Sequence, residues 1–458
     1  MTHRFDAIII GTGQAGPSLA GRLTAAGMTV AIIERHLVGG TCVNTGCMPT
    51  KTLVASAAVA HLARRAADFG VLTGDIRIDM AAVHARSRKI TLDARNGNET
   101  WLRGMEHCTL MFGHARFEGQ RTVRVGAELL EADRIFINVG GRAVIPDLPG
   151  LAEISYFTNA SLLETDVLPE HLVVVGGSYI GLEFAQIYRR FGSRVTVIER
   201  GPRLAAREDE EVSEAIRSFL IAEGVTVRTG ADCIRFRQHD GGIEVGVECA
   251  QGGPDIAGSH VLLAIGRQPN TDDLGLDRAG IKTDKRGYIQ VNDRLETNVP
   301  GIWALGDCNG RGAFTHTSFN DFEIVAANLL DGGDRKVSDR IPCYALYTDP
   351  PLGRVGLTET EARASGRLLL VAKRPMTRVG RAKEKDETTG FMKLVVDAGT
   401  RTILGAAILG TGGDEAIHNV IDIMAAGGNA DTLARTMHIH PTISELVPTL
   451  AGELTPVT

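Results

Sequence analysis

Two segments of the chain follow one plan, in which a short run of β-branched residues enters a glycine turn and then an alanine-rich or amphipathic stretch. The runs are Ala7–Ile10, before Gly11–Gly16, and Leu172–Val175, before Gly176–Gly181. Each unit leads to a second apolar run that ends in an acid, Thr29–Ile33 with Glu34 and Arg194–Ile198 with Glu199. Strand, glycine turn, helix and strand make the βαβ unit, whose strands pair in parallel. The pattern predicts an α/β protein with two nucleotide-binding domains, because the two units start about 165 residues apart.

Shorter apolar runs between and after these units predict further strands. Leu110–Phe117 and Arg121–Val125 are typical of a hairpin, and three more runs end at glycine: Arg134–Val139, Val261–Ile265 and Ile302–Leu305. From Tyr344 onward the pattern is mixed, with antiparallel strands expected at Phe391–Val396 and Ile403–Leu409 and a helix at Ala416–Ala426. We therefore expect a separate α+β domain in the carboxyl-terminal part of the chain.

The composition narrows the classes of function. Of the 458 residues, 43% are apolar and 23% charged, which excludes a disordered chain, collagen and a disulfide scaffold. The formal charge of −6 and an aromatic content of 5% argue against nucleic-acid binding. No apolar run approaches the 18 or so residues of a membrane span, and the first residues do not resemble a signal peptide. We expect a cytoplasmic protein without membrane or nucleic-acid partners.

Gly11, Gly13 and Gly16 have the spacing GxGxxG directly after a predicted strand. The first glycine of such a turn allows the bend, the second admits a pyrophosphate and the third lets the helix approach the sheet. The amino end of the helix then offers amide donors to the phosphates. Glu34 follows Gly16 by 18 residues, near the spacing expected of an acid that binds a ribose hydroxyl. This unit predicts a dinucleotide site.

The second unit keeps the outer glycines, Gly176 and Gly181, and has Ser178 at the middle position. Serine is small but less permissive than glycine, so this copy alone is the weaker signal. Glu199 at the end of the next strand favours a free ribose 2′-hydroxyl and therefore NADH. Two nearby basic residues could instead accept the 2′-phosphate of NADPH: Arg200 and Arg203.

Cys42 and Cys47 are separated by four residues. No second ligand pair at zinc spacing is visible, so metal binding is not predicted. In a regular helix their Cα atoms would lie roughly 8.6 Å apart, beyond the approximately 7 Å limit for a disulfide. A bond between them needs a distorted turn, which Asn44 and Gly46 permit. Cysteines at the start of a helix have lowered pKa values, and Pro49 is typical of such a start.

Four motifs together resemble the flavoprotein pyridine nucleotide-disulfide oxidoreductases, a family that includes dihydrolipoamide dehydrogenase, glutathione reductase and mercuric reductase. They are GGTCVNTGCMPTK at 39–51, AIGRQPN at 264–270, GIWALGD at 301–307 and HPTxSE at 440–445. The resemblance covers nearly the whole chain. It implies two Rossmann-like domains, for FAD and NAD(P), and a carboxyl-terminal dimerisation domain. The implied bounds are 1–147 and 271–340 for the two parts of the FAD domain, 148–270 for the NAD(P) domain and 341–458 for the dimerisation domain.

The resemblance also implies roles for individual residues. Cys42 would exchange with substrate and Cys47 would face the flavin, beside an ion pair of Lys51 and Glu183. His440, oriented by Glu445, would be the general acid/base and would reach the disulfide of the other subunit of a homodimer. The positions implied for FAD are Gly11, Gly13, Gly16, Glu34, Gly40, Thr41, Cys42, Lys51, Gly140, Asp307 and Thr315. Those implied for NADH or NADPH are Gly176, Gly181, Glu199, Gly266 and Arg267.

The substrate is less well defined. Thr50 and the segment at 347–356 are closer to the mercuric-reductase-like branch and to the flavoproteins of reactive-chlorine resistance. Mercuric reductases carry a terminal cysteine pair and generally lack the histidine found here at 440, so dedicated mercury reduction is not expected. Two hypotheses remain. One is an independent NAD(P)H-dependent reductase of a disulfide, a dithiol or a metal ion, and the other is the dihydrolipoamide dehydrogenase subunit of a 2-oxo acid dehydrogenase complex.

Overall fold

The apolar run of the first unit is buried in strand β1 (Thr2–Ile10), at the centre of a seven-stranded sheet. The strand order is β3-β2-β1-β6-β5-β4, and β16 pairs with β6. The strands parallel to β1 are β2 (Val30–Glu34), β3 (Cys108–Phe112), β6 (Glu128–Ile137) and β16 (Ile302–Ala304). An antiparallel hairpin of β4 (Ala115–Gly119) and β5 (Thr122–Val125) completes the sheet. The parallel pairing of β1 and β2 agrees with the predicted βαβ unit.

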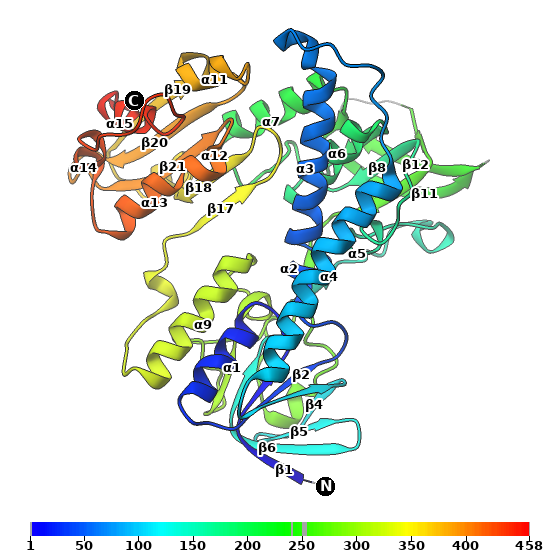
Figure 1. Cartoon of the computed structure of the whole chain (residues 1–458), viewed down its shortest axis with the longest axis vertical. Coiled ribbons are helices and arrows are strands. Elements are labelled where there is room, and N and C mark those ends of the chain that lie inside the picture. The colour runs from blue at the N-terminus through cyan, green and yellow to red at the C-terminus, as the bar shows by residue number, and fades with distance from the viewer. Residues whose placement is uncertain (1, 240, 250–253, 458) are drawn as a thin grey trace.

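The computed structural model describes residues 2–239, 241–249 and 254–457, and its three lobes are visible in Figure 1. The first sheet lies in the lobe that holds the amino terminus, together with α1 (Ala15–Ala25) and α9 (Thr315–Leu330), which pack against each other. From there the chain passes through α2 (Gly40–Asn44) into α3 (Cys47–Arg64), which packs against α4 (Met80–Gly104) and against α6 of the second unit. Helix α3 therefore places its first residues between the two nucleotide-binding units.

The second unit forms a parallel sheet of four strands in the order β10-β9-β8-β14. The strands are β8 (His171–Val175), β9 (Arg194–Ile198), β10 (Thr226–Arg228) and β14 (His260–Leu263), and the helices are α6 (Tyr179–Phe191) and α7 (Glu210–Ala222). An antiparallel sheet of β11 (Ala231–His239), β12 (Gly242–Cys249) and β13 (Ile256–Gly258) lies beside it. A short pair, β7 (Gly141–Ala143) with β15 (Arg267–Pro269), links the first unit to the segment that follows the second.

The carboxyl-terminal lobe is built on a six-stranded antiparallel sheet in the order β17-β18-β21-β20-β19-β22. Its strands are β17 (Cys343–Leu346), β18 (Leu352–Gly356), β19 (Leu369–Pro375), β20 (Phe391–Asp397), β21 (Ile403–Leu409) and β22 (Thr455–Pro456). Its helices are α10 (Glu359–Ala364), α11 (Gly380–Glu384), α12 (Gly413–Ala416), α13 (His418–Ala425), α14 (Ala430–Ala434) and α15 (Leu446–Gly452). The predicted antiparallel pair and the α+β character of this part are confirmed.

The remaining elements are short. They are η1 (Ala66–Phe69), η2 (Leu151–Glu153), α5 (Asn159–Leu162), α8 (Leu276–Ala279), η3 (Gly306–Asn309), η4 (Val337–Asp339) and η5 (Met376–Arg378). Within the described ranges, no helix has the length and apolar character needed to cross a bilayer.

One predicted element is wrong, and another differs slightly in its bounds. Leu110–Phe117 is not one arm of a hairpin, because the chain turns at Gly113, whose φ of 148° suits glycine. The part before Gly113 joins the parallel sheet as β3, and the part after it forms the hairpin as β4. The helix expected at Ala416–Ala426 is observed as α13 (His418–Ala425), and only Ile417, whose backbone is itself helical, separates it from α12. The error at Gly113 arises because a local apolar pattern continues across a turn of the backbone.

Candidate active site

A continuous cavity of about 1750 Å³ runs between the lobes and is lined by residues from both glycine turns. This volume exceeds the roughly 300–1,000 Å³ of a pocket for one drug-sized ligand, and it suits two long cofactors. The predicted site residues that line it are Gly11, Gly13, Glu34, Gly40, Thr41, Cys42, Cys47, Lys51, Gly140, Gly176, Glu183, Glu199, Gly266, Arg267, Asp307 and Thr315. Four predicted residues are not among those lining it in this chain: Gly16, Gly181, His440 and Glu445.

The first glycine turn fits a dinucleotide, because neighbouring backbone atoms leave no room for a side chain at two of its glycines. The backbone can therefore approach the phosphates and the adjacent helix closely. Gly11 has a φ of 106°, and a Cβ there would lie 2.3 Å from the Asn138 carbonyl oxygen. A Cβ on Gly16 would lie 2.4 Å from the Gly11 oxygen, so this glycine lets α1 approach β1. At the end of β2, Glu34 accepts hydrogen bonds from the hydroxyl of Thr12 at 2.5 Å and the amide of His36 at 2.9 Å. The carboxylate is thereby held at the rim of the cavity.

The remaining donors around the first unit also fit FAD. Asp307 follows β16 and faces the cavity, and burial raises the pKa of its carboxyl group. Arg267 places its Nε 3.6 Å from an Asp307 oxygen, so the carboxyl group has a cation beside it. A partly buried carboxyl group that faces a cavity is suited to accept hydrogen bonds from ligand hydroxyls. The residues of this part of the cavity could therefore hold the phosphates, a ribose and the sugar-alcohol chain of FAD.

The second glycine turn repeats this geometry. A Cβ on Gly176 would lie 2.3 Å from the Ala264 carbonyl oxygen, and one on Gly181 would lie 2.0 Å from the Gly176 oxygen. Glu199 accepts hydrogen bonds from the amides of Gly177 at 2.7 Å and Gly201 at 2.6 Å. Its carboxylate is fixed beside the turn, as the ribose-binding role requires.

The basic residues near Glu199 differ from the prediction. Arg200 lines the cavity, whereas Arg203 does not and donates to the Ala206 carbonyl oxygen at 3.4 Å. Arg207 lines the cavity instead. The sequence analysis missed Arg207, although a third arginine within eight residues of Glu199 was the available signal.

Cys42 and Cys47 lie on two different helices. Helix α2 ends at Asn44 and α3 begins at Cys47, with Thr45 and Gly46 outside helical geometry. A Cβ on Gly46 would lie 2.8 Å from the Thr41 carbonyl oxygen, so only glycine fits this crossing. The Asn44 side chain donates to the Val38 carbonyl oxygen at 3.0 Å and the Gly40 carbonyl oxygen at 2.9 Å, which holds the short helix in place. The expected distorted turn is thus a helix break that brings the two sulfur atoms into contact.

The two thiols, which are free in the structure, differ in acidity. A hydrogen bond from Cys42 lowers the pKa of the Cys47 thiol to about 6, and Thr315 and the charge of Lys51 lower it further, against burial. The Thr315 hydroxyl lies 3.3 Å from the Cys47 sulfur. The same sulfur–sulfur contact raises the pKa of Cys42, and burial adds to this effect. Cys47 is therefore the thiolate and Cys42 keeps its proton near neutral pH.

Titration of the reduced protein should show this asymmetry. We expect one thiolate to form with a midpoint near pH 6, measured from its ultraviolet absorbance under anaerobic conditions. Because the folded pKa is lowered, the thiolate is present above this pH and is lost as the pH falls through it. Cys47→Ser should remove this transition. Cys108→Ser should leave it unchanged, because burial raises the pKa of Cys108 to about 11. A first midpoint near pH 9 would contradict the assignment.

The predicted ion pair forms beside the cysteines. Lys51, on α3 one turn after Cys47, donates to Glu183 on α6 at 2.7 Å, and the Glu183 side chain is only 6% exposed. The Tyr347 amide donates to the second Glu183 oxygen at 3.0 Å, and the Lys51 Nζ lies 4.6 Å from the centre of the Tyr347 ring. The sequence analysis gave Tyr347 only as part of the segment at 347–356, because nothing local indicates that a tyrosine contacts this ion pair. Residues from all three lobes therefore hold the ion pair in place.

His440 and Glu445 are joined by a hydrogen bond of 2.7 Å at Nδ1 of the histidine, which leaves Nε2 free to face a substrate. The His440 side chain is 81% exposed, on a loop whose apolar residues Met437 and Ile439 are 94% and 79% exposed. The structure thus pairs the two residues but does not bring them to the cysteines of their own chain's cavity.

The other candidates have structural environments. Cys308 is buried and contacts the Leu305 carbonyl oxygen at 3.3 Å, and His316 contacts the Cys343 carbonyl oxygen at 2.7 Å. No group of three or more histidine, cysteine or acidic side chains suited to a metal ion occurs among the residues that the structure describes.

Comparisons with known proteins agree with this geometry. Residues 5–321 match the family model "Pyridine nucleotide-disulphide oxidoreductase", and residues 343–451 match the dimerisation domain of that family. The chain is 36% identical to the probable pyridine nucleotide-disulfide oxidoreductase RclA of Escherichia coli, over 97% of this chain and 98% of that protein. It is 36% identical to the dihydrolipoyl dehydrogenase of Thermus scotoductus, over 96% and 95%. A solved structure, the Cu(II) complex of the HOCl-induced flavoprotein disulfide reductase RclA from Escherichia coli, superposes with a TM-score of 0.90 at 34% identity, over 98% of this chain and 99% of that chain.

Proposed function

Because the chain belongs to the pyridine nucleotide-disulphide oxidoreductase family, whose members use FAD and a pyridine nucleotide, we propose that it is an NADH-dependent reductase of small disulfides or of copper ions. The observation that carries this proposal is the pair of unequal thiols at the start of α3. One thiol is acidic and the other keeps its proton, and they lie beside the Lys51–Glu183 pair. FAD, when bound, supplies the two-electron chemistry that connects the nucleotide with this pair.

The two thiols have complementary tasks in disulfide reduction. Cys42 loses its proton to a base and its sulfur attacks one sulfur of the substrate, whose other half leaves as a thiolate and takes a proton. The Cys47 thiolate then attacks the Cys42 sulfur, which closes the Cys42–Cys47 disulfide and releases the second half of the substrate as a thiolate, which takes a proton from water. His440, whose Nδ1 is bound by Glu445, is the group that takes the first proton and returns it to a leaving thiolate.

Copper ions are the second substrate class. The E. coli relative was solved as a Cu(II) complex, and thiolates are the ligands that soft metal ions prefer. Two Cu(II) ions reduced to Cu(I) would take the two electrons of the reduced pair, which becomes the Cys42–Cys47 disulfide and releases the one proton of Cys42. Such a reaction needs no further cofactor in the cavity.

The second candidate is dihydrolipoamide dehydrogenase. The His440–Glu445 pair favours it, since this pair suits proton transfer to and from a dithiol, and the Thermus scotoductus relative bears that name at equal identity. The two candidates differ in direction, because the dehydrogenase oxidises a dithiol with NAD⁺.

One panel of acceptors tests the proposed function. NADH oxidation by the FAD-loaded protein would be measured with Cu(II), Hg(II), glutathione disulfide and lipoamide, and NAD⁺ reduction with free dihydrolipoamide. We expect the largest kcat/KM with Cu(II) or with a small disulfide in the reducing direction. A dominant rate with dihydrolipoamide would instead support the second candidate. If no acceptor increases NADH oxidation and dihydrolipoamide does not reduce NAD⁺, both candidates are overturned.

NADH should be preferred over NADPH by about tenfold or more in kcat/KM. The Glu199 carboxylate, held beside the turn by two amides, would meet the 2′-phosphate as a like charge. Glu199→Gln should reduce the preference, and Arg207→Ala should increase it because Arg207 lines the cavity. Arg203→Ala is the matched control and should leave the ratio unchanged. A clear preference of the wild type for NADPH would mean that the arginines outweigh Glu199.

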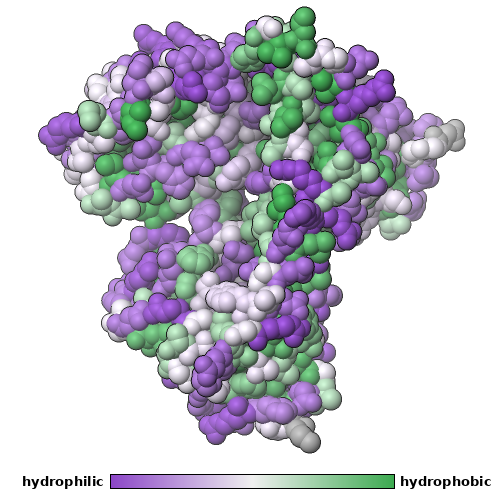
Figure 2. Space-filling model, in the orientation of Figure 1, coloured by the Kyte–Doolittle hydropathy of each residue, from purple (hydrophilic) through white to green (hydrophobic). Residues whose placement is uncertain are grey.

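We further propose a homodimer in which His440 acts at the cysteines of the other subunit. The dimerisation-domain match and the exposed apolar residues around His440 support this arrangement. A second apolar surface lies at the far end of α3, where Val59 and Leu62 are more than half exposed; this end of the helix is green in Figure 2. Exposed apolar surface of this kind is typical of a protein interface.

A further inference from the structure

A chain of contacts connects the second glycine turn with the carboxyl-terminal lobe. Tyr179 is the first residue of α6 and lines the cavity, and its hydroxyl donates to the Glu208 carboxylate at 2.5 Å. Tyr344 on β17 donates to the same oxygen at 2.7 Å, and the two tyrosine rings have centroids 5.6 Å apart. Phe314 stacks on Tyr344 at 5.4 Å, so an aromatic wall lines this part of the cavity. Glu208 lies behind the wall and does not line the cavity.

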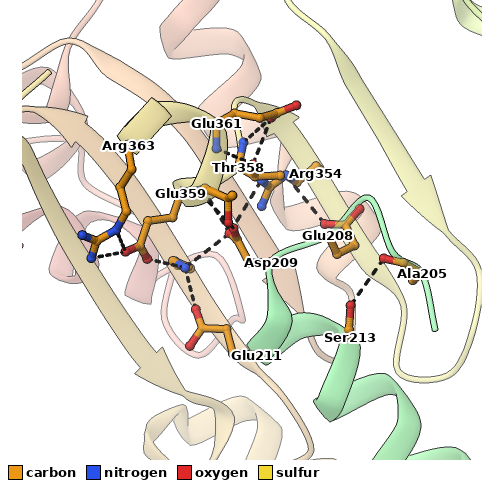
Figure 3. Close-up of polar contacts among 12 residues, drawn as sticks. Ala205, Glu208, Asp209, Glu211, Ser213, Arg354, Thr358, Glu359, Glu361 and Arg363 are labelled. Atoms are coloured by element: carbon orange, nitrogen blue, oxygen red, sulfur yellow. Dashed lines mark hydrogen bonds and ion pairs between the residues drawn. The ribbon is translucent and has the colours of Figure 1, made fainter. Parts of the chain in front are cut away.

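The Glu208 carboxylate is held in a buried junction of charges, shown in Figure 3. Its side chain is fully buried, and its second oxygen lies 3.8 Å from the Arg354 guanidinium on β18, whose side chain is only 1% exposed. The neighbouring Asp209 accepts amide hydrogen bonds from Glu359 and Thr360 at 3.0 Å each. The loop that carries Glu208 is thus bound to the start of α10.

Lys393 completes this junction from β20. Its Nζ lies 2.6 Å from both Glu211 and Glu359 and 3.3 Å from Asp209, and its side chain is buried. Separating the two partners of a buried ion pair costs free energy, because it leaves a buried charge without compensation. The carboxylates of these pairs therefore have little freedom to move. Glu208 is therefore carried on a loop that the carboxyl-terminal lobe holds in place through Asp209, with one oxygen bound by two tyrosine hydroxyls and the other 3.8 Å from Arg354.

Tyr179 lies where a nucleotide bound at the second glycine turn would pass, so a fixed Tyr179 ring affects ligand binding. A nucleotide with its pyrophosphate on the Gly176 turn has one end at Glu199, which is suited to the adenosine ribose. Its other end must extend toward Glu183, which lies one helical turn beyond Tyr179 on the same side of α6, and toward the ion-pair partner of Glu183, Lys51 on α3. The Tyr179 ring therefore stands beside the path of the nicotinamide half, and a fixed ring would bind this half without first losing conformational freedom.

We propose that Glu208 is a positioning residue for the pyridine nucleotide: it holds the Tyr179 ring in the place where the nicotinamide half of the nucleotide binds. This inference rests on the proposed function, because it takes the second glycine turn as the nucleotide site. Glu208 acts through Tyr179 and does not touch the nucleotide. Arg354 and the charges around Asp209 and Lys393 keep it in place.

Removal of the single hydroxyl in Tyr179→Phe tests the proposal. We expect the KM for NADH and the Kd for NAD⁺ on the oxidised, FAD-loaded protein to rise about 3- to 10-fold, with kcat changed less than about twofold. The Kd for ADP-ribose, which lacks the nicotinamide, should stay the same. Glu208→Ala should reproduce these changes. Glu208→Gln, which keeps an oxygen acceptor for both tyrosines, should restore most of the affinity for NAD⁺.

Tyr188→Phe is the matched control, because it removes a hydroxyl from the same helix at a buried position that does not contact Glu208. If Glu208→Ala does not fold, Tyr179→Phe alone decides. Equal Kd values for NAD⁺ in Tyr179→Phe and Tyr188→Phe would overturn the inference and leave the proposed function intact. So would a parallel loss of affinity for NAD⁺ and ADP-ribose. A wild-type protein that binds neither ligand would overturn the proposed function itself.

Discussion

Replacement of Cys47 by serine is expected to lower the turnover of disulfide substrates by a factor on the order of 10⁴ or more, which is the scale of losing an essential nucleophile. The reason is that the thiolate is the sulfur which closes the Cys42–Cys47 disulfide, and a serine hydroxyl does not ionise near neutral pH. NADH oxidation with ferricyanide, an acceptor that does not require the dithiol, should stay within about threefold of wild type. Steady-state kinetics with both acceptors measure this split.

The neighbouring position provides a sharper control. Cys42→Ser also removes disulfide turnover, but its hydroxyl can still donate to the Cys47 thiolate, so the Cys47 pKa should stay near 6. Cys42→Ala removes the donor, and the Cys47 pKa should rise toward that of an ordinary thiol. Equal pKa values in these two variants would show that the hydrogen bond is not the main cause. Disulfide turnover that survives in Cys47→Ser would reject the assigned role.

The features that could be predicted from the sequence are those in which a local pattern carries the geometry. Gly11 and Gly176 each follow a buried strand, and at both positions a Cβ would clash with a backbone carbonyl. The spacing of Cys42 and Cys47 similarly required a distorted turn, and the structure has a helix break at Gly46. In these cases the neighbours that exclude other residues lie on the same unit or on the adjacent strand.

The features that the sequence analysis missed depend on contacts between distant parts of the chain. Tyr347 contacts Lys51, about 300 residues earlier, and Arg354 lies beside Glu208 in another lobe. Both belong to the segment at 347–356 that carries the resemblance, but a resemblance of this kind does not say which distant residues they contact. Arg207 shows a third case, in which the loop after β9 decides which of several nearby arginines faces the cavity. Composition gives the charges of such a loop but not their directions.

Replacement of His440 by glutamine is expected to slow thiol–disulfide exchange by about 10² to 10⁴, the usual contribution of a placed general acid/base. Glutamine keeps the size of the side chain and can still contact Glu445, but it cannot carry a proton between Cys42 and a leaving thiolate. The binding of NAD⁺ should not change, since His440 does not line the nucleotide part of this chain's cavity. Rapid mixing of the reduced protein with a disulfide substrate measures the exchange step. Exchange at the wild-type rate would exclude His440 as the acid/base.

Mixing two inactive variants shows on which subunit His440 acts. A heterodimer of a His440→Gln chain and a Cys42→Ser chain has one site with both defects and one intact site, if each site takes its histidine from the partner. At equal mixing about half of the dimers are heterodimers, so activity should recover to about a quarter of the wild-type value. If each histidine instead served the cysteines of its own chain, both sites of every heterodimer would carry one defect. Absence of recovery despite verified subunit exchange would therefore place His440 beside its own Cys42, against the 81% exposure of its side chain and its separation from the cavity of its own chain.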